Sequence, residues 1–330
     1  MIVEHDVPLA PKTTLGLGGP ARRLVRVTST AELPDALALS DDILVLGGGS
    51  NLVIGDAGWP GVVLEIALRG VSIDCHSVSV AAGVVWDDLV AQMVRAGRAG
   101  VECLSGIPGL VGATPMQNVG AYGQEVSDTI TSVRAYDRER REFVTMTPAE
   151  CRFGYRTSVF RGSARWIVVD VTFALPRGER SAPIRYAELA RALGVQEGER
   201  APLQQVRDTV LALRRGKGMV VDPADPDSRS AGSFFTNPLV DAATAARVGG
   251  PQWPQPDGRV KLSAGWLIER AGFAKGTTRG RVGISSKHAL ALVNRGGATA
   301  SELLALAREI ADGVRARLGV ELSPEPVIVQ

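Results

Sequence analysis

Residues 105–123 give the clearest indication of the fold and read SGIPGLVGATPMQNVGAYG. This segment, hereafter the neutral loop, holds five glycines, two prolines and no charged residue. An exposed connection of this length normally carries charge, so we expect backbone that packs closely on a flat or bulky group, with its N–H groups as donors. Gln117, Asn118 and Tyr122 are polar exceptions whose side chains would suit the edge of a ring. A buried, irregular core connection is the alternative interpretation.

A second glycine-rich segment, the GGGSN loop at 47–51, follows the strand-like run ILVL at 43–46 directly. Successive small residues let backbone N–H groups turn toward one point, which suits a phosphate, although a simple tight turn would use the same residues. The spacing is not a dinucleotide fingerprint, because the third glycine of GxGxxG would fall on Leu52. Two such loops in one chain suggest a large cofactor between two domains.

Composition and charge exclude several classes of protein. The chain has 330 residues, of which 45% are hydrophobic and 22% charged, as is typical of a soluble globular protein. Its 37 basic and 35 acidic residues are interspersed and leave a net charge of +2, so no surface for nucleic acid is indicated. Three cysteines without a CxxC pair and only three histidines argue against a disulfide framework, a metal site and a histidine-based triad.

The location of the protein is predicted from what the sequence does not contain. No apolar run approaches the roughly 18–20 residues that cross a bilayer. The start, MIVEHDVPLA, lacks the basic-then-apolar layout of a signal peptide. We therefore expect a cytoplasmic protein without a membrane partner.

The spacing of apolar residues predicts an α+β chain of three units, at 1–66, 67–215 and 216–330. Strands are expected at 24–27, 43–46, 62–66, 71–80, 130–136, 142–146 and 166–175. Helices are expected at 32–39, 86–97 and 201–215, with Gly216 as the end of the third. A further helix opens at the capping box of Thr299 and Glu302 and ends at Gly319, before a short final strand. Residues 216–232 are expected to form a boundary loop.

Three single residues are candidates for chemistry. Arg156 lies between aromatic and apolar neighbours, which suits bidentate binding of a carboxylate, of a ligand or of the protein itself. Ser233 follows a glycine and precedes two phenylalanines; it is not in a GxSxG motif, so it is either a turn residue or a proton donor to a strongly basic carbanion. Glu325, flanked by Pro324 and Pro326, is on composition alone an edge-strand gatekeeper.

The chain resembles the UDP-N-acetylenolpyruvoylglucosamine reductase (UDP-N-acetylmuramate dehydrogenase) family of peptidoglycan synthesis in six segments that occur in the same order. They are GGGSN, GIPGLVGATPMQNVGAYG, FGYRTSVF, AGSFFTNP, KLSAGWLIERAGF and the final PE. The resemblance spans nearly the whole chain, from TTLGLGGPA to the last strand. The run IRYAEL, with Tyr186, is similar to the form of the enzyme whose extra tyrosine loop closes over the substrate.

This resemblance implies a three-domain FAD-binding fold of the vanillyl-alcohol-oxidase/PCMH flavin superfamily type. Residues 1–66 and 67–215 would be its two FAD-binding subdomains, and 216–330 a C-terminal substrate-binding domain whose final strand can return to the first subdomain. FAD would be held without a covalent bond, since neither glycine-rich segment contains His or Cys. The implied FAD-binding residues are Gly47, Gly48, Gly49, Ser50, Asn51, Gly106, Ile107, Pro108, Gly109, Thr114, Gln117, Asn118, Gly120, Ala121, Tyr122 and Gly123.

The resemblance also implies the reaction. NADPH, the co-substrate, would pass a hydride to the flavin, which passes it to the β-carbon of UDP-N-acetylglucosamine enolpyruvate to give UDP-N-acetylmuramate. Arg156 would bind the substrate carboxylate and stabilise developing charge, Glu325 would hydrogen-bond the same group, and Ser233 would protonate the α-carbon. The implied substrate contacts are Tyr186, Lys217, Asn237 and Lys275. Nicotinamide and sugar nucleotide would use one pocket in turn.

The sequence departs from the family pattern in two places that bear on these residues. The family tail commonly reads PEVR, whereas Pro326 and Val327 follow Glu325 here. The segment GFAKGTT, with Lys275, is one residue longer than the usual GLKG, and no role is assigned to His288 in SSKHAL. The resemblance implies no metal, and we expect a monomer.

Two other functions are compatible with parts of the sequence. Another FAD-dependent oxidoreductase on the same scaffold, such as an alcohol or hydroxy-acid oxidase, would explain the two glycine-rich loops but not the GSFF segment or Glu325. A non-catalytic protein that binds nucleotide sugars would be colourless and would not take up FAD.

Overall fold

The structure is a computed structural model that describes residues 1–330 and groups the chain into two compact units. The first unit comprises Met1–Val7, Ala21–Gly48 and Pro60–Arg215. The second comprises Pro8–Pro20, Gly49–Trp59 and Gly216–Gln330. Two short segments from the first 66 residues thus belong with the C-terminal part of the chain. The division into three domains stays a prediction.

The first unit begins with a four-stranded sheet in the order β1-β2-β5-β3. Its strands are β1 (Ile2–Pro8), β2 (Pro20–Val27), β5 (Trp59–Ile66) and β3 (Ile43–Leu46). Strand β3 runs parallel to β5, with Ile43 opposite Val62. The short helix α1 (Leu33–Leu37) buries Leu33 and Ala36 in the same core as β2 and β5. The strands expected at 24–27, 43–46 and 62–66 are confirmed.

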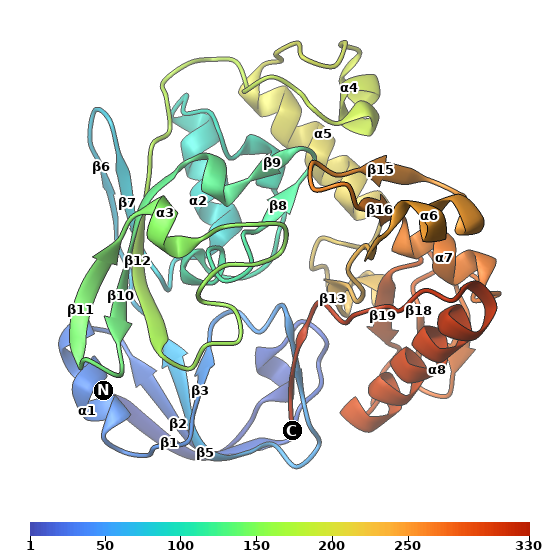
Figure 1. Ribbon diagram of the computed structural model, residues 1–330. Helices are drawn as coiled ribbons and strands as arrows, with labels where there is room; N and C mark the ends of the chain where they lie inside the picture. Colours follow the sequence, from blue (N-terminus) through green and yellow to red (C-terminus); the bar gives the residue numbers. More distant parts are fainter. The chain divides into compact units, whose positions relative to one another are not determined.

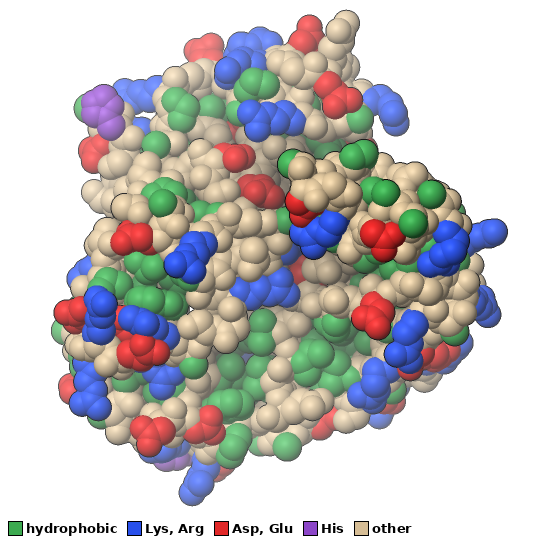
Figure 2. All heavy atoms as spheres, in the orientation of Figure 1, with side chains coloured by type: hydrophobic (Ala, Val, Ile, Leu, Met, Phe, Trp, Pro, Cys, Tyr) green, Lys and Arg blue, Asp and Glu red, His purple; other side chains and the backbone are tan.

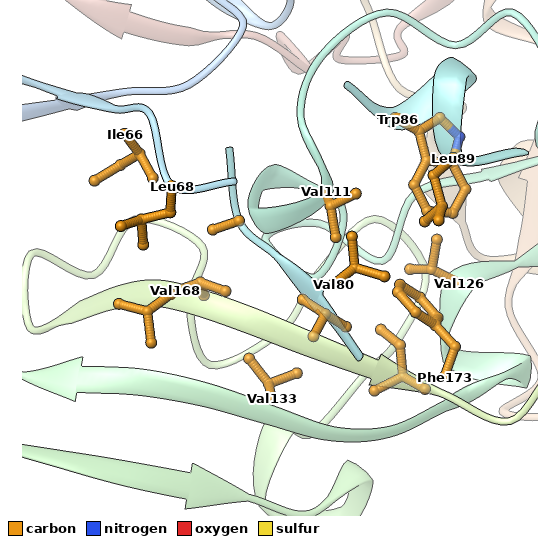
Figure 3. Packing of buried hydrophobic residues seen from close by; sticks show 14 of the residues in the cluster. Ile66, Leu68, Val80, Trp86, Leu89, Val111, Val126, Val133, Val168 and Phe173 are labelled. Atoms are coloured by element: carbon orange, nitrogen blue, oxygen red, sulfur yellow. The ribbon is translucent and has the colours of Figure 1, made fainter. Parts of the chain in front are cut away.

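The second sheet of this unit is antiparallel and has the order β11-β10-β12-β7-β6. Its strands are β6 (Val71–Ile73), β7 (Val78–Ala81), β10 (Ile130–Asp137), β11 (Glu142–Met146) and β12 (Trp166–Phe173). Helix α2 (Trp86–Arg95) confirms the helix expected at 86–97 and buries five apolar residues at helical spacing, Trp86, Leu89, Val90, Met93 and Val94. Figure 3 shows residues of this core, with Trp86 and Leu89 of α2 near Phe173 of β12. The Trp86 and Phe173 ring centroids lie 6.0 Å apart.

The single strand expected at 71–80 is wrong, because β6 and β7 form a hairpin. Asp74 accepts hydrogen bonds from the N–H groups of His76 (2.8 Å) and Ser77 (2.7 Å), which closes the turn between the strands. The same hydrogen bonds lower the pKa of Asp74 to about 2. The apolar alternation continues on both sides of this turn, so periodicity alone did not reveal it.

The remaining strands and α-helices of the first unit lie within the neutral loop or after it in the chain. They are β8 (Gly120–Ala121), β9 (Gln124–Glu125), α3 (Pro148–Cys151), α4 (Ala187–Leu193) and α5 (Leu203–Gly216). A small apolar cluster joins α4 and α5 to Cys103 and Tyr122. Burial raises the pKa of the Cys103 thiol, as expected of a packing residue. The helix expected at 201–215 is confirmed as α5.

The second unit contains three small sheets. An antiparallel sheet has the order β13-β19-β18-β17, a second has the order β14-β16-β15, and β20 pairs in parallel with β4. The strands are β4 (Leu52–Ile54), β13 (Ser230–Ser233), β14 (Leu239–Val240), β15 (Gln252–Pro254), β16 (Val260–Leu262), β17 (Thr278–Arg279), β18 (Val282–Ile284), β19 (Ala291–Asn294) and β20 (Val327–Val329). The helices are α6 (Ala242–Val248), α7 (Ala264–Arg270) and α8 (Ala300–Leu318).

Helix α8 has the ends that its sequence predicted. Thr299 and Glu302 form a reciprocal capping box, and Gly319 ends the helix in the left-handed conformation at φ 65°. Figure 1 shows α8 beside α7 and the strands β18 and β19, with which it shares a core. Its buried apolar face includes Leu303, Ile310 and Val314.

The surface carries acidic and basic side chains in similar numbers, as the sequence does. On the face drawn in Figure 2, acidic and basic side chains are interspersed. None of the helices combines the length and the apolar character needed to cross a bilayer.

Candidate functional site

The two glycine-rich loops meet through their backbones in the first unit. A Cβ atom at Gly48 would lie 2.7 Å from the Cα atom of Gly109, closer than real contacts allow. Gly106 and Gly109 have φ values of 71° and 118°, which residues other than glycine rarely adopt. The two loops therefore contact each other through their backbones at Gly48 and Gly109, and their packing on a cofactor stays a prediction.

Gly49 adopts a left-handed φ of 58° and packs against the carbonyl of Lys12 in the second unit. The Gly49 carbonyl accepts a hydrogen bond from the Thr14 N–H at 3.2 Å. Gly47 and Gly48 thus belong to one unit, whereas Gly49, Ser50 and Asn51 belong to the other.

The middle of the neutral loop is a buried core connection. Val111 and Gly112 donate N–H hydrogen bonds of 2.9 Å to the carbonyls of Val84 and Ala82. Thr114 is 3% exposed, and its hydroxyl donates to the Val111 carbonyl at 2.8 Å. The alternative interpretation of the loop, a buried core connection, therefore holds for its middle, and packing of the remainder on a flat group stays a prediction.

Asp87, in the first turn of α2, fixes the start of this loop. Its carboxylate accepts a hydrogen bond from the Gly106 N–H at 2.6 Å and bidentate hydrogen bonds from Arg207 of α5 at 2.7 and 2.8 Å. Burial raises the pKa of Asp87, but these hydrogen bonds outweigh burial, so the pKa lies below its usual value. The sequence analysis missed both residues. The only signal was an acidic residue in the first turn of a predicted helix.

Asn118 is fully buried, and its side chain links protein segments. The amide nitrogen donates to Glu125 (2.6 Å) and to the Gly154 carbonyl (3.2 Å), and the amide oxygen accepts from the Ser127 N–H (3.1 Å). The prediction that this side chain suits a ring edge is wrong, since both of its amide hydrogens are used within the protein. The Asn118 backbone has a left-handed φ of 47°, and its N–H donates to the Pro115 carbonyl at 3.4 Å.

The turn that Asn118 fastens carries Arg156. Gly154 and Thr157 exchange backbone hydrogen bonds of 3.0 and 3.2 Å, and Arg156 between them has a φ of 52°. The Arg156 guanidinium donates from Nη2 to the Gly120 carbonyl at 2.8 Å. The structure therefore brings Arg156 to the C-terminal end of the neutral loop, where Gln117, Ala121, Tyr122 and Gly123 also lie.

Tyr186 lies against the same end of the loop. Its ring makes an edge contact with the ring of Tyr122, with centroids 5.4 Å apart at 84°. The side chain is 43% exposed, and burial of the remainder raises the pKa of its hydroxyl.

Ser233 and Glu325 come together in the second unit. Ser233 ends β13, opposite Ala291 of β19, after an irregular stretch in which Gly232 has a φ of 72°. Such a bulge redirects the side chain that follows it. The Glu325 N–H donates to the carbonyl of Phe234, the residue after Ser233, at 2.9 Å.

Asn51 of the GGGSN loop contacts the same segment. Its amide nitrogen donates to the Glu325 carbonyl at 3.5 Å, and its own carbonyl accepts the Val327 N–H at 3.0 Å. Asn51, a predicted FAD-binding residue, therefore hydrogen-bonds to the backbone of Glu325, a predicted catalytic residue.

The remaining predicted residues are dispersed in the second unit. The Asn237 side-chain oxygen accepts the N–H of Ala264 at the start of α7, at 2.9 Å. Lys217 is partly buried just after α5, and Lys275 is exposed in the turn after α7. Lys275 makes no hydrogen bond to Ser233 or Asn237.

An α+β chain in which Gly48 packs on the backbone of a second glycine-rich loop has features typical of a cofactor-binding protein. A family model described as an FAD binding domain matches residues 21–145, so the chain is an FAD-binding oxidoreductase. A second family model, the UDP-N-acetylenolpyruvoylglucosamine reductase C-terminal domain, matches residues 223–329.

Named relatives and a solved structure agree with these family models. A UDP-N-acetylenolpyruvoylglucosamine reductase of Thermobifida fusca (strain YX) is 55% identical over 98% of this chain and 97% of its own. That of Streptomyces coelicolor is 55% identical over 98% and 90%. A crystal structure of the reductase from Thermus caldophilus covers 100% of both chains at 30% identity and a TM-score of 0.73. The chain belongs to the UDP-N-acetylenolpyruvoylglucosamine reductase family.

These findings confirm the family resemblance, the α+β FAD-binding fold and FAD as the cofactor. An oxidase on the same scaffold is not favoured, since the match includes the C-terminal domain of the reductase. The residues present fit FAD, because the neutral loop carries no charge that would repel a phosphate and its backbone is bare at Gly106 and Gly109.

Proposed function

We propose that this chain reduces UDP-N-acetylglucosamine enolpyruvate to UDP-N-acetylmuramate with NADPH as the reductant. Family membership across both units supports this reaction. The observation that carries it is the hydrogen bond that ties Glu325 to the residue after Ser233, since the reaction needs a proton donor and a carboxylate partner in one place. The product places the enzyme in peptidoglycan precursor synthesis, and hence in cell wall biogenesis, cell shape and cell division. We propose a cytoplasmic monomer.

FAD would be held by the GGGSN loop and the neutral loop. The contributing residues are Gly47, Gly48, Gly49, Ser50, Asn51, Gly106, Ile107, Pro108, Gly109, Thr114, Gln117, Asn118, Gly120, Ala121, Tyr122 and Gly123. When bound, FAD supplies the means of carrying a hydride from NADPH to the substrate. The side chains of Thr114 and Asn118 are engaged within the protein. The N–H groups of Gly106, Thr114 and Asn118 donate to Asp87, Val111 and Pro115, so these residues would shape the loop around FAD.

Arg156 would bind the enolpyruvyl carboxylate and stabilise the charge that develops there during hydride addition. The hydrogen bond from its Nη2 to Gly120 orients the guanidinium before substrate arrives, so little reorganisation is needed. A guanidinium is the side chain best suited to bind a carboxylate in the bidentate manner.

Ser233 would deliver a proton to the substrate α-carbon. A hydroxyl is a weak acid, and it can act here because a carbanion next to a carboxylate is far more basic. Glu325 would hydrogen-bond the substrate carboxylate from the neighbouring strand segment. The two residues would thus serve adjacent atoms of one substrate.

Tyr186, Lys217, Asn237 and Lys275 would contact the sugar nucleotide. The lysines and the tyrosine suit a diphosphate, since they donate hydrogen bonds or carry positive charge. Asn237 uses its amide oxygen at the start of α7, which leaves its amide N–H groups for the ligand.

Stepwise titration of the purified protein tests the function. NADPH should bleach the flavin absorbance, and UDP-N-acetylglucosamine enolpyruvate should restore it, with deuterium from labelled NADPH in the product. In Ser233→Ala, we expect flavin reduction to proceed and the second step to slow by about 10²–10⁴-fold, the usual worth of a positioned proton donor. Thr236→Ala, which removes a hydroxyl from the same segment, is the control. Normal turnover of Ser233→Ala would assign the proton to another donor.

A further inference from the structure

Glu102 carries a fully buried carboxylate that has no role in the proposed reaction. It lies in the 3₁₀ turn Glu102–Leu104, just before the neutral loop, and its exposed fraction is 0%. Three N–H groups donate to it: Gly100 (2.6 Å), the Gln124 amide (2.9 Å) and Ala182 (2.9 Å). All its hydrogen-bond partners are donors, which matches a group that accepts only.

The three donors come from three different parts of the first unit. Gly100 lies two residues before Glu102, just ahead of the 3₁₀ turn. Gln124 follows Gly123, the last residue of the neutral loop, and its side-chain oxygen accepts the Cys103 N–H at 2.9 Å. Ala182 belongs to residues 181–201, hereafter the Tyr186 segment, which is fastened to itself by the hydrogen bond from the Ser181 N–H to the Ala201 carbonyl (2.8 Å).

The Tyr186 segment rests on the end of the neutral loop at two further points. The rings of Tyr186 and Tyr122 are in contact, and a Cβ atom at Gly123 would lie 3.0 Å from the Cβ atom of Arg185. The Glu102 carboxylate therefore binds both the Tyr186 segment, through Ala182, and the end of the neutral loop, through Gln124. The same two segments also contact each other directly at Tyr186 and Tyr122.

We propose that Glu102 is a positioning residue that holds Tyr186 against the cofactor-binding loop and so sets the affinity for the sugar nucleotide. This inference rests on the proposed function, in which Tyr186 contacts that substrate. Removing the carboxylate leaves buried N–H groups without an acceptor, and the attachment least supported by local structure is that of Ala182, 80 residues away in the chain.

The substitution Glu102→Gln is nearly isosteric but turns an NH₂ group toward at least one of the three N–H donors. In the holoenzyme we expect the KM for UDP-N-acetylglucosamine enolpyruvate to rise about tenfold or more. The rate of flavin reduction by NADPH should change by less than about twofold, because the loop that binds FAD keeps its own hydrogen bonds. Trypsin should also cleave faster at Arg180, Arg185 and Arg191.

A double-mutant cycle with Tyr186→Ala separates positioning from general damage. If Glu102 acts through Tyr186, Glu102→Gln adds little to the KM in the Tyr186→Ala background. Equal effects of Glu102→Gln with and without Tyr186 would overturn the proposal. Asp137→Asn is the control, because Asp137 is equally buried and hydrogen-bonded, but to Arg165 beside β10. It should lower thermal stability without a change in KM.

A milder variant covers the case in which Glu102→Gln does not fold. Glu102→Asp keeps the charge but withdraws the carboxylate by one methylene, away from Ala182. We expect an increase in KM and in trypsin cleavage of the Tyr186 segment, both smaller than for the glutamine variant. A folded Glu102→Asp enzyme with the cleavage pattern and KM of the parent would also overturn the proposal. If the parent does not turn over the sugar nucleotide, the proposed function fails, while the cleavage pattern still reports on the attachment.

Discussion

At the scale of single residues, Asp87 shows how a carboxylate outside the glycine loops governs their shape. It accepts the Gly106 N–H and both terminal nitrogens of Arg207, so α2, α5 and the start of the neutral loop share one charged junction. The N–H of Gly106 is thereby held in a fixed direction. Loss of the junction should therefore be felt in the stability of the fold and in the retention of FAD.

Asp87→Asn should lower the free energy of unfolding by about 1–2 kcal/mol at pH 7, as expected for a partly exposed charged pair. Because the pKa of Asp87 is lowered in the folded protein, the ion pair contributes fully above about pH 4 and is lost as the pH falls through that lowered pKa. The difference between parent and variant in urea unfolding should therefore shrink below pH 4. Asp88→Asn, exposed in the same turn, is the control. If the difference in free energy of unfolding between parent and Asp87→Asn did not change with pH, the ion pair would not be its cause.

The sequence predicted the residues whose role depends on local backbone and missed those whose role depends on distant partners. Gly106, Gly109 and Gly48 were recognisable because a missing side chain is visible in the sequence itself. The partners of Asp87, Glu102 and Asn118 lie up to 120 residues away. Nothing near these residues in the chain distinguishes them from other polar residues, and for Asn118 the sequence suggested a different role for the side chain.

At the scale of elements, α8 combines a local cap that the sequence predicted with a distant one that it did not. Thr299 and Glu302 satisfy each other's backbone N–H groups, whereas the N–H groups of Ala300 and Ser301 donate to Asp56 at 2.7 and 3.0 Å. Asp56 comes from the segment Gly49–Trp59. A negative charge at the first turn of a helix also interacts favourably with the helix dipole.

Asp56→Ala should therefore destabilise the second unit by about 1–2 kcal/mol, the usual cost of losing a helix cap. Thermal unfolding followed by circular dichroism at 222 nm would measure the loss. Asp312→Ala is the matched control, since it removes an exposed ion pair with Arg315 on the same helix, which is worth about 1 kcal/mol or less. Equal effects of the two substitutions would show that Asp56 is not a cap.

Among strands, the sequence located the apolar runs but not every turn. The run at 71–80 reads as one alternating strand, and only the hydrogen bonds of Asp74 divide it into β6 and β7. Short strands such as β8, β9 and β17 have two residues each, and their pairing depends on the loops beside them. Such strands have no periodicity from which to predict them.

At the scale of the whole molecule, FAD should stabilise the folded chain by mass action. A ligand at 100 times its dissociation constant adds about 2.7 kcal/mol to the free energy of unfolding. For a domain of roughly 150–250 residues, each kcal/mol raises the melting temperature by about 2–4 °C. Removal of FAD should thus lower the melting temperature by several degrees, and added FAD should restore it.

Differential scanning calorimetry of the apo and reconstituted protein would measure this shift. AMP, which shares one phosphate and the adenine with FAD but lacks the flavin ring, is a suitable control ligand. Identical melting of apo and holo forms would contradict a structural role for the cofactor.

The family was predictable from the sequence because its segments are specific in residue and order. The grouping of the chain was harder to predict, because residues 49–59 belong with the C-terminal unit through β4 and β20. Parallel pairing of Leu52 with Val327 joins positions far apart in the chain, and such pairing leaves no trace in either segment alone.

The pairing of β20 with β4 has a practical consequence for handling the protein. Glu325 is followed, after one proline, by the three residues that form the last strand, and Gln330 beyond them is exposed. A purification tag can therefore extend from Gln330, whereas a stop codon placed even four residues early would leave β4 unpaired. Trimming the tail for crystallisation would then loosen the backbone on which Glu325 depends.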